Sequence, residues 1–276
     1  MRTEIIYEDK DILVIYKPAG LATQTAKLGQ ADVVSELKSY LARAQKVGRD
    51  TYLGIIHRLD QPVEGLLIFA KHKKAAADLT AQLQRQGEGG NLHKHYYAVV
   101  CGKVAEQQGR LVDYMYKSSE NLAVIVEGYR DSEAHSSEVL PDKDKTGVVG
   151  KNSAAMPEPK KAELEYRILK EKNFAGKSMG GIYANPSEEG TIHLALADIH
   201  ILTGRFHQIR AQMAHGRMPL LGDAKYGTAE AKEWARTLGV QSVALCAYSL
   251  EFRHPATGKL MRFEERPRGK AFGLFL

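Results

Sequence analysis

The residues of this sequence best suited to chemistry lie in one short stretch, HRLD, at positions 57–60. His57 and Arg58 place two basic groups beside the single carboxylate of Asp60. Basic neighbours keep a carboxylate ionised, so Asp60 could attack an electrophile or stabilise a developing positive charge. A loop, QPVEG, and a continuous apolar run, LLIFA, come next, and such a run is typical of a strand buried on both faces. An acid on a loop that a buried strand holds in place is well suited to catalysis. The alternative is a polar turn before a core strand.

A second group of polar residues lies in the stretch LTGRFHQIR at 202–210. The TG turn after an apolar strand predicts a helix that Thr203 caps. Arg205, His207 and Arg210 would then lie near the N-terminus of this helix, which is a natural position for an anion. A structural helix with a basic first turn is the alternative.

A third candidate is Tyr96, in the alternating stretch KHYYAVVCG at 94–102. The alternation places Tyr96 on one face of a strand together with small apolar residues. From spacing alone, a core aromatic is the favoured interpretation. His93 and His95 lie in the same region, but the sequence shows no Cys or carboxylate partner, so they give little support for a metal site.

The elements that must position these groups follow from apolar periodicity and from turn residues. Helices are expected over 32–48, which Asp32 would cap and Gly48 would end, over 73–86 and over 229–238. Strands are expected over two segments of 4–17, over 66–70, 94–102, 162–169 and 192–201, over two segments of 111–126, and over a hairpin at 242–264. The segment 127–160 is polar and has no sustained period, which predicts a surface insertion with mobile loops. The whole chain, 1–276, is then a single domain built on a central sheet.

The composition is that of a globular protein, with 43% hydrophobic and 26% charged residues. No apolar run approaches the length of a membrane span, and the N-terminus lacks the apolar core of a signal peptide, so neither a membrane-spanning nor a secreted protein is expected. Cys101 and Cys246 are too few for a disulfide framework, which favours a reducing cytoplasm. The net charge of +6 and the pI near 9.1 suit a polyanionic partner, although many basic proteins bind no nucleic acid.

Four motifs in a fixed order resemble those of the RluA-type pseudouridine synthases. They are HRLD with its loop and strand, K-x-Y-x-A-x-V-x-G at 94–102, L-x-T-G-R-x-H-Q-I-R at 202–210 and G-D-x-x-Y-G at 222–227, after an opening KPAG turn at 17–20. The resemblance implies an α+β fold, the pseudouridine synthase catalytic fold, with a central mixed or antiparallel sheet, flanking helices and a two-lobed active-site cleft. It also implies isomerisation of specific uridines to pseudouridine in structured ribosomal or transfer RNA, without a metal or another cofactor.

The resemblance assigns roles to the matching positions of this sequence. It implies that Asp60 is catalytic, that Arg210 forms a bidentate pair with Asp60, and that Tyr96 contacts the target base, either as a stacking surface or as a base in proton transfer. Further substrate contacts are expected from Ile209, under the target base, and from the basic residues His57, Arg58, Arg205 and His207. The expected partner is RNA. The protein is expected to be a monomer in the cytoplasm, without the small N-terminal RNA-binding domain that many family members carry.

Some residues depart from the family pattern, namely Val63 and Glu64 in place of Thr-Ser, Phe206 in place of Thr or Ser, and Cys246 in place of a common His. A second carboxylate at Glu64 would raise the pKa of Asp60 and repel RNA unless it were neutralised. We therefore expect Glu64 to be paired inside the protein and to brace the loop without a part in the chemistry. The candidate partners are Arg58, Arg205 and His207.

Two functions of other classes remain open. A catalytically silent RNA-binding or assembly protein could share the fold, and the altered loop QPVEG favours it, whereas the intact Asp60, Tyr96 and Arg210 oppose it. A hydrolase that uses His57 with Asp60 would need a nucleophilic Ser or an oxyanion loop, and no G-x-S-x-G motif is present.

Overall fold

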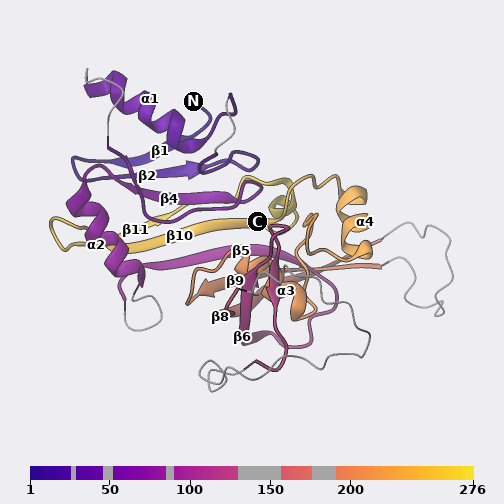
Figure 1. Cartoon of the computed structure of the whole chain (residues 1–276). Coiled ribbons are helices and arrows are strands. Elements are labelled where there is room, and N and C mark those ends of the chain that lie inside the picture. The colour runs from indigo at the N-terminus through magenta and orange to yellow at the C-terminus, as the bar shows by residue number, and fades with distance from the viewer. Residues whose placement is uncertain (26–28, 46–51, 85–89, 130–156, 176–190) are drawn as a thin grey trace, which may run out of the picture.

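A computed structural model describes residues 1–25, 29–45, 52–84, 90–129, 157–175 and 191–276. In these ranges the strands form one 11-stranded sheet in the order β1-β2-β4-β10-β5-β9-β8-β6-β7, with β3 paired to β4 and β11 paired to β10 (Figure 1). The strands are β1 Glu4–Glu8, β2 Ile12–Lys17, β3 Gly54–Ile55, β4 Glu64–Ala70, β5 His93–Cys101, β6 Gln108–Lys117, β7 Ala123–Ile125, β8 Lys160–Ala175, β9 Thr191–Ile201, β10 Leu245–Arg253 and β11 Leu260–Glu264. The helices are α1 Val33–Gln45, α2 Lys73–Gln84, α3 Gln208–His215, α4 Ala229–Leu238 and the 3-10 helix η2 Lys270–Leu274. The sheet is mixed, as expected, because β4 and β10 run parallel while the other described pairs of strands are antiparallel.

The first two helices cover opposite faces of the sheet. β2 and β4 are buried throughout, so both faces of these apolar strands have to be covered. Leu13 of β2 belongs to the same hydrophobic cluster as Leu37 of α1, whereas Val14 belongs to the cluster that contains Leu79 of α2. Neighbouring residues of a strand point to opposite faces, so α1 and α2 lie on opposite sides of the sheet.

The other half of the sheet repeats this arrangement with α3 and α4. Ile209 and Met213 of α3 belong to the cluster of α1, whereas Ala231 of α4 packs in another cluster with Leu194 of β9 and Tyr16 of β2. Tyr16 alternates in register with Val14, so α4 lies on the same side as α2. We call the two sides of the sheet the α1/α3 face and the α2/α4 face.

Most of the expected elements are confirmed, including the two N-terminal strands, the pair at 111–126 and the C-terminal hairpin. Asp32 caps α1, since its Oδ1 accepts a hydrogen bond from the amide of Ser35 at 2.7 Å. The expected helix end at Gly48 and most of the insertion at 127–160 lie outside the described residues. In the described ranges no helix combines the length and the apolar character of a membrane span.

The helix that was expected to begin at Thr203 begins at Gln208 instead. His207 precedes it with a left-handed φ of 51°, and the Thr203 hydroxyl donates to the side-chain oxygen of Gln208 at 2.8 Å. The prediction that Thr203 caps this helix is therefore wrong, because the residues after it form a turn. β8 is also longer than expected, running from Lys160 to Ala175.

Candidate active site

Asp60 lies on the loop that joins β3 to β4, with 24% of its side chain exposed. The loop is anchored in the core, because Leu59 and Val63, on either side of Asp60 in the sequence, are buried in the hydrophobic cluster of the α1/α3 face. Thr23 holds it further, since its hydroxyl donates to the carbonyl of Leu59 at 2.8 Å and accepts from the Leu59 amide at 3.2 Å. The Asp60 carboxylate is thus carried on a fixed backbone and remains open to solvent.

Lys17, in the KPAG turn, fastens a second loop to the loop of Asp60. Its buried ammonium donates to the carbonyls of Pro18 at 3.1 Å, Leu21 at 2.6 Å and Gln61 at 3.1 Å. Burial lowers the pKa of Lys17 to about 7, and the carboxylates of Asp60 and Glu64 oppose that decrease. The sequence analysis gave Lys17 no role, although the KPAG motif marked its position.

Arg210 brings α3 to the Asp60 carboxylate, but its bidentate pair is with another acid. Nε and Nη2 each donate at 2.7 Å to one oxygen of Asp223, and Nη1 donates at 3.1 Å to Oδ2 of Asp60. Asp223 is buried and also accepts from the amides of Lys225 and Tyr226. The expected bidentate pair of Arg210 with Asp60 is corrected to a single hydrogen bond, because Asp223 occupies the fork of the guanidinium.

Opposing effects of burial and pairing act on this group. Burial alone would raise the pKa of Asp223, but the hydrogen bonds and charge of Arg210 outweigh burial and hold that pKa below its usual range. Burial alone would lower the pKa of Arg210, but the carboxylates of Asp223 and Asp60 outweigh burial and raise that pKa. Both residues of this pair therefore stay charged, and Asp60 faces a permanent positive charge.

His207 provides a second contact to the same oxygen of Asp60, with Nε2 3.4 Å from Oδ2. On its other side, Nδ1 lies 2.8 Å from the hydroxyl of Tyr226, which accepts a hydrogen bond from the Ala123 amide at 2.7 Å. Burial and the nearby Arg210 lower the pKa of His207 to about 4 against the attraction of Asp60, so the ring is neutral near pH 7. Its one proton belongs on Nε2, because an unprotonated Nε2 would face a carboxylate. Tyr226 then donates to Nδ1, and the protonated Nε2 faces the Asp60 carboxylate.

Tyr96 and Ile209 are buried in the same hydrophobic cluster as Leu59 and Val63, next to the Asp60 loop. Burial raises the pKa of the Tyr96 hydroxyl, and the negative charge of Asp60 raises it further. The phenol is therefore neutral near pH 7 and offers an aromatic surface rather than a basic oxygen.

The remaining residues expected to contact the substrate lie in different environments. Arg58 and Arg205 are exposed, and Arg205 Nε donates to the carbonyl of Lys161 at 2.8 Å. His57 is buried, and neither of its ring nitrogens has a hydrogen-bond partner in the described residues. Burial, together with the charge of Lys94, lowers the pKa of His57 well below its ordinary value. The structure thus gathers Asp60, His207 and Arg210 and leaves His57 beneath the surface.

Glu64 braces the loop as expected, but with partners other than the expected ones. Its carboxylate accepts from the Tyr16 hydroxyl at 2.7 Å and from the amides of Gly269 at 2.8 Å and Arg268 at 3.2 Å. The prediction of a partner among Arg58, Arg205 and His207 is wrong, because Glu64 is the first residue of a buried strand and its side chain points toward the C-terminal segment.

Phe206 forms an exposed aromatic surface next to these residues. It is 37% exposed, and its ring stacks on His207 with the ring centroids 3.8 Å apart. The ammonium of Lys117 lies 4.7 Å from the centroid of Phe206, within the range of a cation–π interaction. An aromatic residue in place of the Thr or Ser of the family pattern therefore covers the histidine that contacts Asp60.

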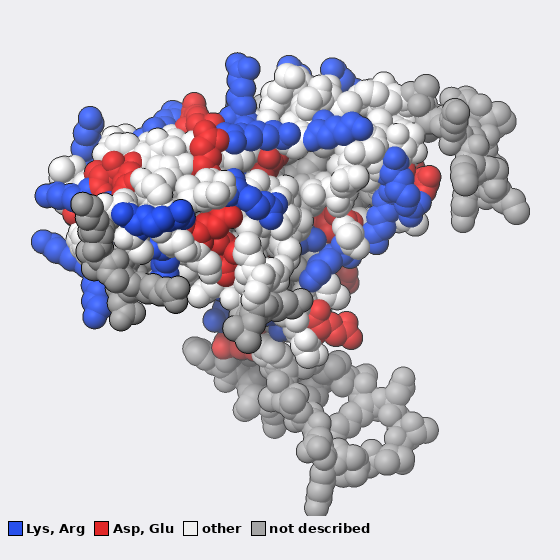
Figure 2. Space-filling model, turned by 90° about the horizontal axis from the view of Figure 1, so that it is seen from above, with Lys and Arg blue, Asp and Glu red and all other residues white. Residues whose placement is uncertain are grey.

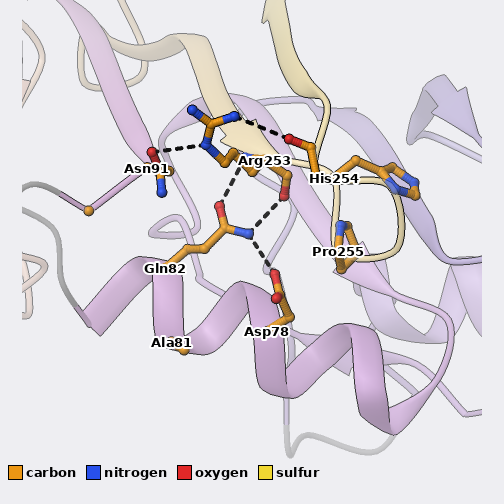
Figure 3. Close-up of a pocket in the computed structure, with 9 residues that line it drawn as sticks. Asp78, Ala81, Gln82, Asn91, Arg253, His254 and Pro255 are labelled. Carbon is orange, nitrogen blue, oxygen red and sulfur yellow. Dashed lines mark hydrogen bonds between the residues drawn. The ribbon is translucent and has the colours of Figure 1, made fainter.

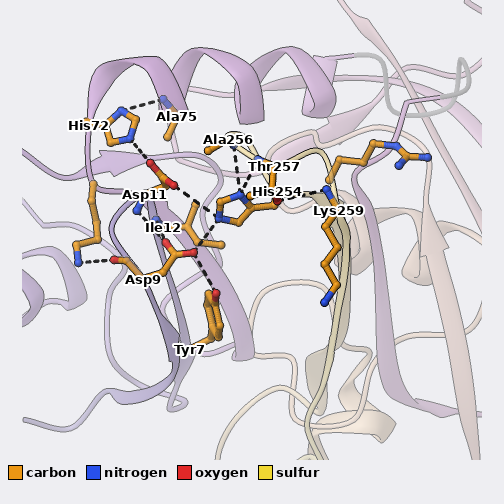
Figure 4. A network of polar contacts seen from close by, with 12 residues as sticks. Tyr7, Asp9, Asp11, Ile12, His72, Ala75, His254, Ala256, Thr257 and Lys259 are labelled. Atoms are coloured by element: carbon orange, nitrogen blue, oxygen red, sulfur yellow. Dashed lines mark hydrogen bonds and ion pairs between the residues drawn. The ribbon is translucent and has the colours of Figure 1, made fainter.

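A group that resembles a metal site lies elsewhere, where ligand atoms of Asp9, Asp11 and His254 come within 4.8 Å of one another (Figure 4). The hydrogen bonds of the imidazole oppose metal binding. His254 Nδ1 accepts from the amides of Ala256 and Thr257, both at 3.2 Å, so the proton of the neutral ring lies on Nε2 and is donated to Asp9 at 2.8 Å. A metal ion at Nε2 would move this proton to Nδ1, where two amides already point at the ring. We interpret the group as a structural network.

His254 also lines a surface pocket of about 290 Å³ between α2 and the turn that joins β10 to β11 (Figure 3). The polar groups of this pocket are bonded to one another. The Gln82 side chain exchanges hydrogen bonds of 2.7 and 2.9 Å with the backbone of Arg253, and the Arg253 guanidinium donates to Asn91 and Gly258. We therefore place the chemistry at Asp60, where a partly exposed carboxylate faces fixed donors.

Comparison with known proteins shows what this chain is similar to. The model of a family described as RNA pseudouridylate synthase matches residues 11–215. The chain is 29% identical to tRNA pseudouridine synthase C of Yersinia pestis, over 95% of this chain and 86% of that protein. It is 30% identical to ribosomal large subunit pseudouridine synthase D of Pseudomonas aeruginosa, over 95% of this chain and 67% of that protein. The solved structure of human RNA pseudouridylate synthase domain containing 4 shares the fold, with a TM-score of 0.63 at 21% identity over 96% of this chain and 89% of that chain.

Proposed function

Because the chain belongs to the RNA pseudouridylate synthase family and is an enzyme that isomerises uridine in RNA, we propose that Asp60 is its catalytic residue. The observation that carries this proposal is the position of the donors around its carboxylate. Both Arg210 and His207 contact Oδ2, and in the described part of the chain no donor reaches Oδ1. Oδ1 is therefore the oxygen left to act on the substrate, while Oδ2 holds the carboxylate in place.

The reaction detaches uracil from the ribose at nitrogen 1, turns it and rejoins it through carbon 5. Oδ1 of Asp60 would either form a covalent bond with the substrate or stabilise the positive charge that develops at the anomeric carbon. Arg210 would keep the carboxylate oriented in both cases. Asp223 would act through Arg210 as a positioning residue, since it holds two of the guanidinium nitrogens.

Tyr96 and Ile209 would form the apolar surface against which the uracil turns. Their burial in one cluster beside the Asp60 loop supports this role. A neutral phenol has no negative charge with which to take the proton from carbon 5, so the stacking role of Tyr96 is favoured over its role as a base.

The target uridine must leave the base stack to reach Asp60, at a cost of a few kcal/mol. Arg58 and Arg205 are exposed in the two segments that form the site and would hold the phosphates around the extruded nucleotide. Figure 2 shows Lys and Arg side chains spread over one face of the molecule with acidic side chains among them. With a net charge of +6, such a surface gives RNA affinity that depends on salt, but it distinguishes neither ribosomal from transfer RNA nor one uridine from another. We propose that the substrate is one of these two RNA classes, as the names of the relatives suggest.

The test is the release of tritium from RNA labelled at carbon 5 of uridine. We expect the wild-type chain to release tritium and the Asp60→Asn variant to release none, while the variant binds RNA within about twofold of wild type, because phosphate contacts supply most of the affinity. Asp78→Asn, which changes an exposed acid on α2, is the matched control and should remain active. Turnover by Asp60→Asn near the wild-type rate would reject Asp60 as the catalytic residue. RNA binding without tritium release by wild type would instead support the silent RNA-binding protein.

A further inference from the structure

The α2/α4 face of the sheet carries three histidines close together. His93 and His95 alternate on β5 and so share this face, opposite to Tyr96. His95 is the direct cross-strand neighbour of His200 on β9. The ring centroids are 4.6 Å apart for His95 and His200, which stack, and 5.6 Å apart for His93 and His200. The sequence analysis discounted His93 and His95 for want of a partner, and the pairing of β5 with β9 supplies one.

Two carboxylates orient these rings in a way that leaves nitrogen lone pairs available. His95 Nδ1 lies 3.4 Å from Oδ1 of Asp198, and His200 Nδ1 lies 3.8 Å from Oε2 of Glu165. A carboxylate at Nδ1 places the proton there and leaves the lone pair of Nε2 free, as at histidines that bind metals. His200 Nε2 is buried and has no hydrogen-bond partner in the described residues, which is a costly arrangement without a ligand.

We propose that His93, His95 and His200 form a binding site for one divalent transition-metal ion, with Zn²⁺ as the expected class of ligand. Three neutral imidazoles from one sheet face are a suitable donor set for Zn²⁺, and a fourth position would remain for water. Burial lowers the pKa of His200, and the neighbouring histidines lower it further, which keeps this ring neutral. His254 differs from these histidines in its tautomer. Its ring proton occupies Nε2, the nitrogen that a metal ion would need.

Metal binding requires a rearrangement of the side chains. The ring nitrogens of the three histidines do not all lie within 4.8 Å of one another, whereas Zn–N bonds of about 2.0–2.1 Å require them to converge further. His95 has 35% of its side chain exposed and His200 has 23%, so the rings have room to turn about their side-chain torsions. The strand register fixes the distances between the backbone positions, and the stack of His95 on His200 would open around the ion.

The experiment is a titration of the chelator-treated full chain with Zn²⁺, followed by calorimetry, and with Co²⁺, followed by its visible absorption. We expect one tight site per chain and Co²⁺ bands typical of nitrogen ligands. His95→Gln and His200→Gln should each weaken Zn²⁺ binding by at least about tenfold, and Asp198→Asn, which removes an orienting carboxylate, by about tenfold. His193→Gln changes another histidine of β9 that bonds to Asn173 and should bind Zn²⁺ as wild type does.

The proposal is independent of the proposed function, because Asp60→Asn should bind Zn²⁺ as wild type does. If a histidine variant fails to fold, the wild-type protein still provides a test, since Zn²⁺ should shift the NMR signals of the His93, His95 and His200 rings and not those of His193. An absence of a tight site in wild type would overturn the proposal. Equal weakening of binding in His193→Gln and His200→Gln would overturn it as well, since binding would then be non-specific.

Discussion

The positive charge of Arg210 is shared unequally between two carboxylates. Asp223 takes two of its nitrogens at 2.7 Å, and Asp60 takes the third at 3.1 Å. The guanidinium is therefore held in place by the buried Asp223, and Asp60 meets a donor whose position does not depend on the substrate. This is preorganisation, in which the cost of orienting a charge is met during folding rather than during the reaction.

We expect Arg210→Lys to lose nearly as much activity as Arg210→Ala. An ammonium is a point charge and cannot contact both oxygens of Asp223 and still reach Asp60. Tritium release at saturating RNA measures the loss, with RNA affinity as the control. A Lys variant with near-normal turnover would mean that only the charge of Arg210 matters.

The neutral state of His207 predicts how stability depends on pH. Its pKa is about 4 in the folded protein and near 6.5 in the unfolded chain, so the unfolded chain binds a proton more readily. The stability that neutral His207 contributes is complete above about pH 6.5 and is lost as the pH falls from 6.5 toward 4.

Urea unfolding at pH 7.5 and pH 5 measures this effect. Wild type should lose more stability between these two conditions than His207→Gln, which cannot gain the proton. His57, whose pKa burial also lowers, is present in both proteins and cancels in the comparison. Equal losses in the two proteins would show that His207 does not titrate in this range.

At the scale of elements, the loop of Asp60 is held between strands that are distant in sequence. Glu64 accepts hydrogen bonds from Tyr16 on β2 and from the amide of Gly269 before η2. Gly65 then passes β10 so closely that a Cβ would lie 2.4 Å from the carbonyl oxygen of Ala247, and its φ of 124° strongly favours glycine. The brace therefore joins β2 and the segment before η2 to the start of β4, at the base of the Asp60 loop.

We expect Glu64→Ser to lower stability by about 1–3 kcal/mol, because a short hydroxyl cannot reach the three donors that Glu64 now satisfies. The rate of isomerisation should fall by at most about tenfold, or about 1.4 kcal/mol of barrier, since Glu64 does not contact the reacting atoms. Glu64→Gln, which keeps one acceptor oxygen, should lie between Ser and wild type in urea unfolding. A Ser variant as inactive as Asp60→Asn, with fold and RNA affinity intact, would place Glu64 in the chemistry.

Local signals predicted the elements well and the pairings poorly. The run LLIFA and the alternation around Tyr96 predicted buried strands, because the burial and direction of strand side chains follow from the order of consecutive apolar and polar residues. The start of α3 was mispredicted, because no residue type in this stretch indicates that His207 adopts a left-handed conformation. Asp60 was expected to form the bidentate pair with Arg210 because the resemblance implied that pair. Asp223, the buried acid 13 residues from Arg210, was recognised only as part of a motif.

The sequence could not predict contacts between residues that only the fold brings together. Glu64 bonds to an amide 205 residues away, and a backbone amide carries no residue signature that a search for basic partners could find. The third histidine of the proposed metal site, His200, is also distant from His93 and His95 in sequence, and only the pairing of β5 with β9 places it beside them.

For the molecule as a whole, the two faces of the sheet separate two kinds of group. Asp60, Tyr96 and Arg210 lie in the segments that form the α1/α3 face, and the three histidines lie on the α2/α4 face. A ligand on the second face therefore has the thickness of the sheet between it and the reacting atoms.

We expect isomerisation to survive removal of metal ions. Treatment with a Zn²⁺-selective chelator should leave the rate of tritium release within about twofold, on an RNA hairpin that folds in monovalent salt alone. The physical reason is that, in the proposed mechanism, Asp60 and Arg210 supply the charges that an ion would otherwise supply. Loss of activity that one added divalent ion restores, with the hairpin still folded, would contradict this.

The brace at Glu64 also has a consequence for the time at which the protein becomes an enzyme. A ribosome makes the Asp60 loop first, makes Arg210 150 residues later, and makes Gly269 205 residues after Glu64. Until Arg210 is made the Asp60 loop lacks its cation, and until Leu245–Arg253 is made β4 lacks its parallel partner. We therefore expect a nascent chain that has not yet reached Arg210 to be unable to modify RNA, although it already carries the Asp60 loop.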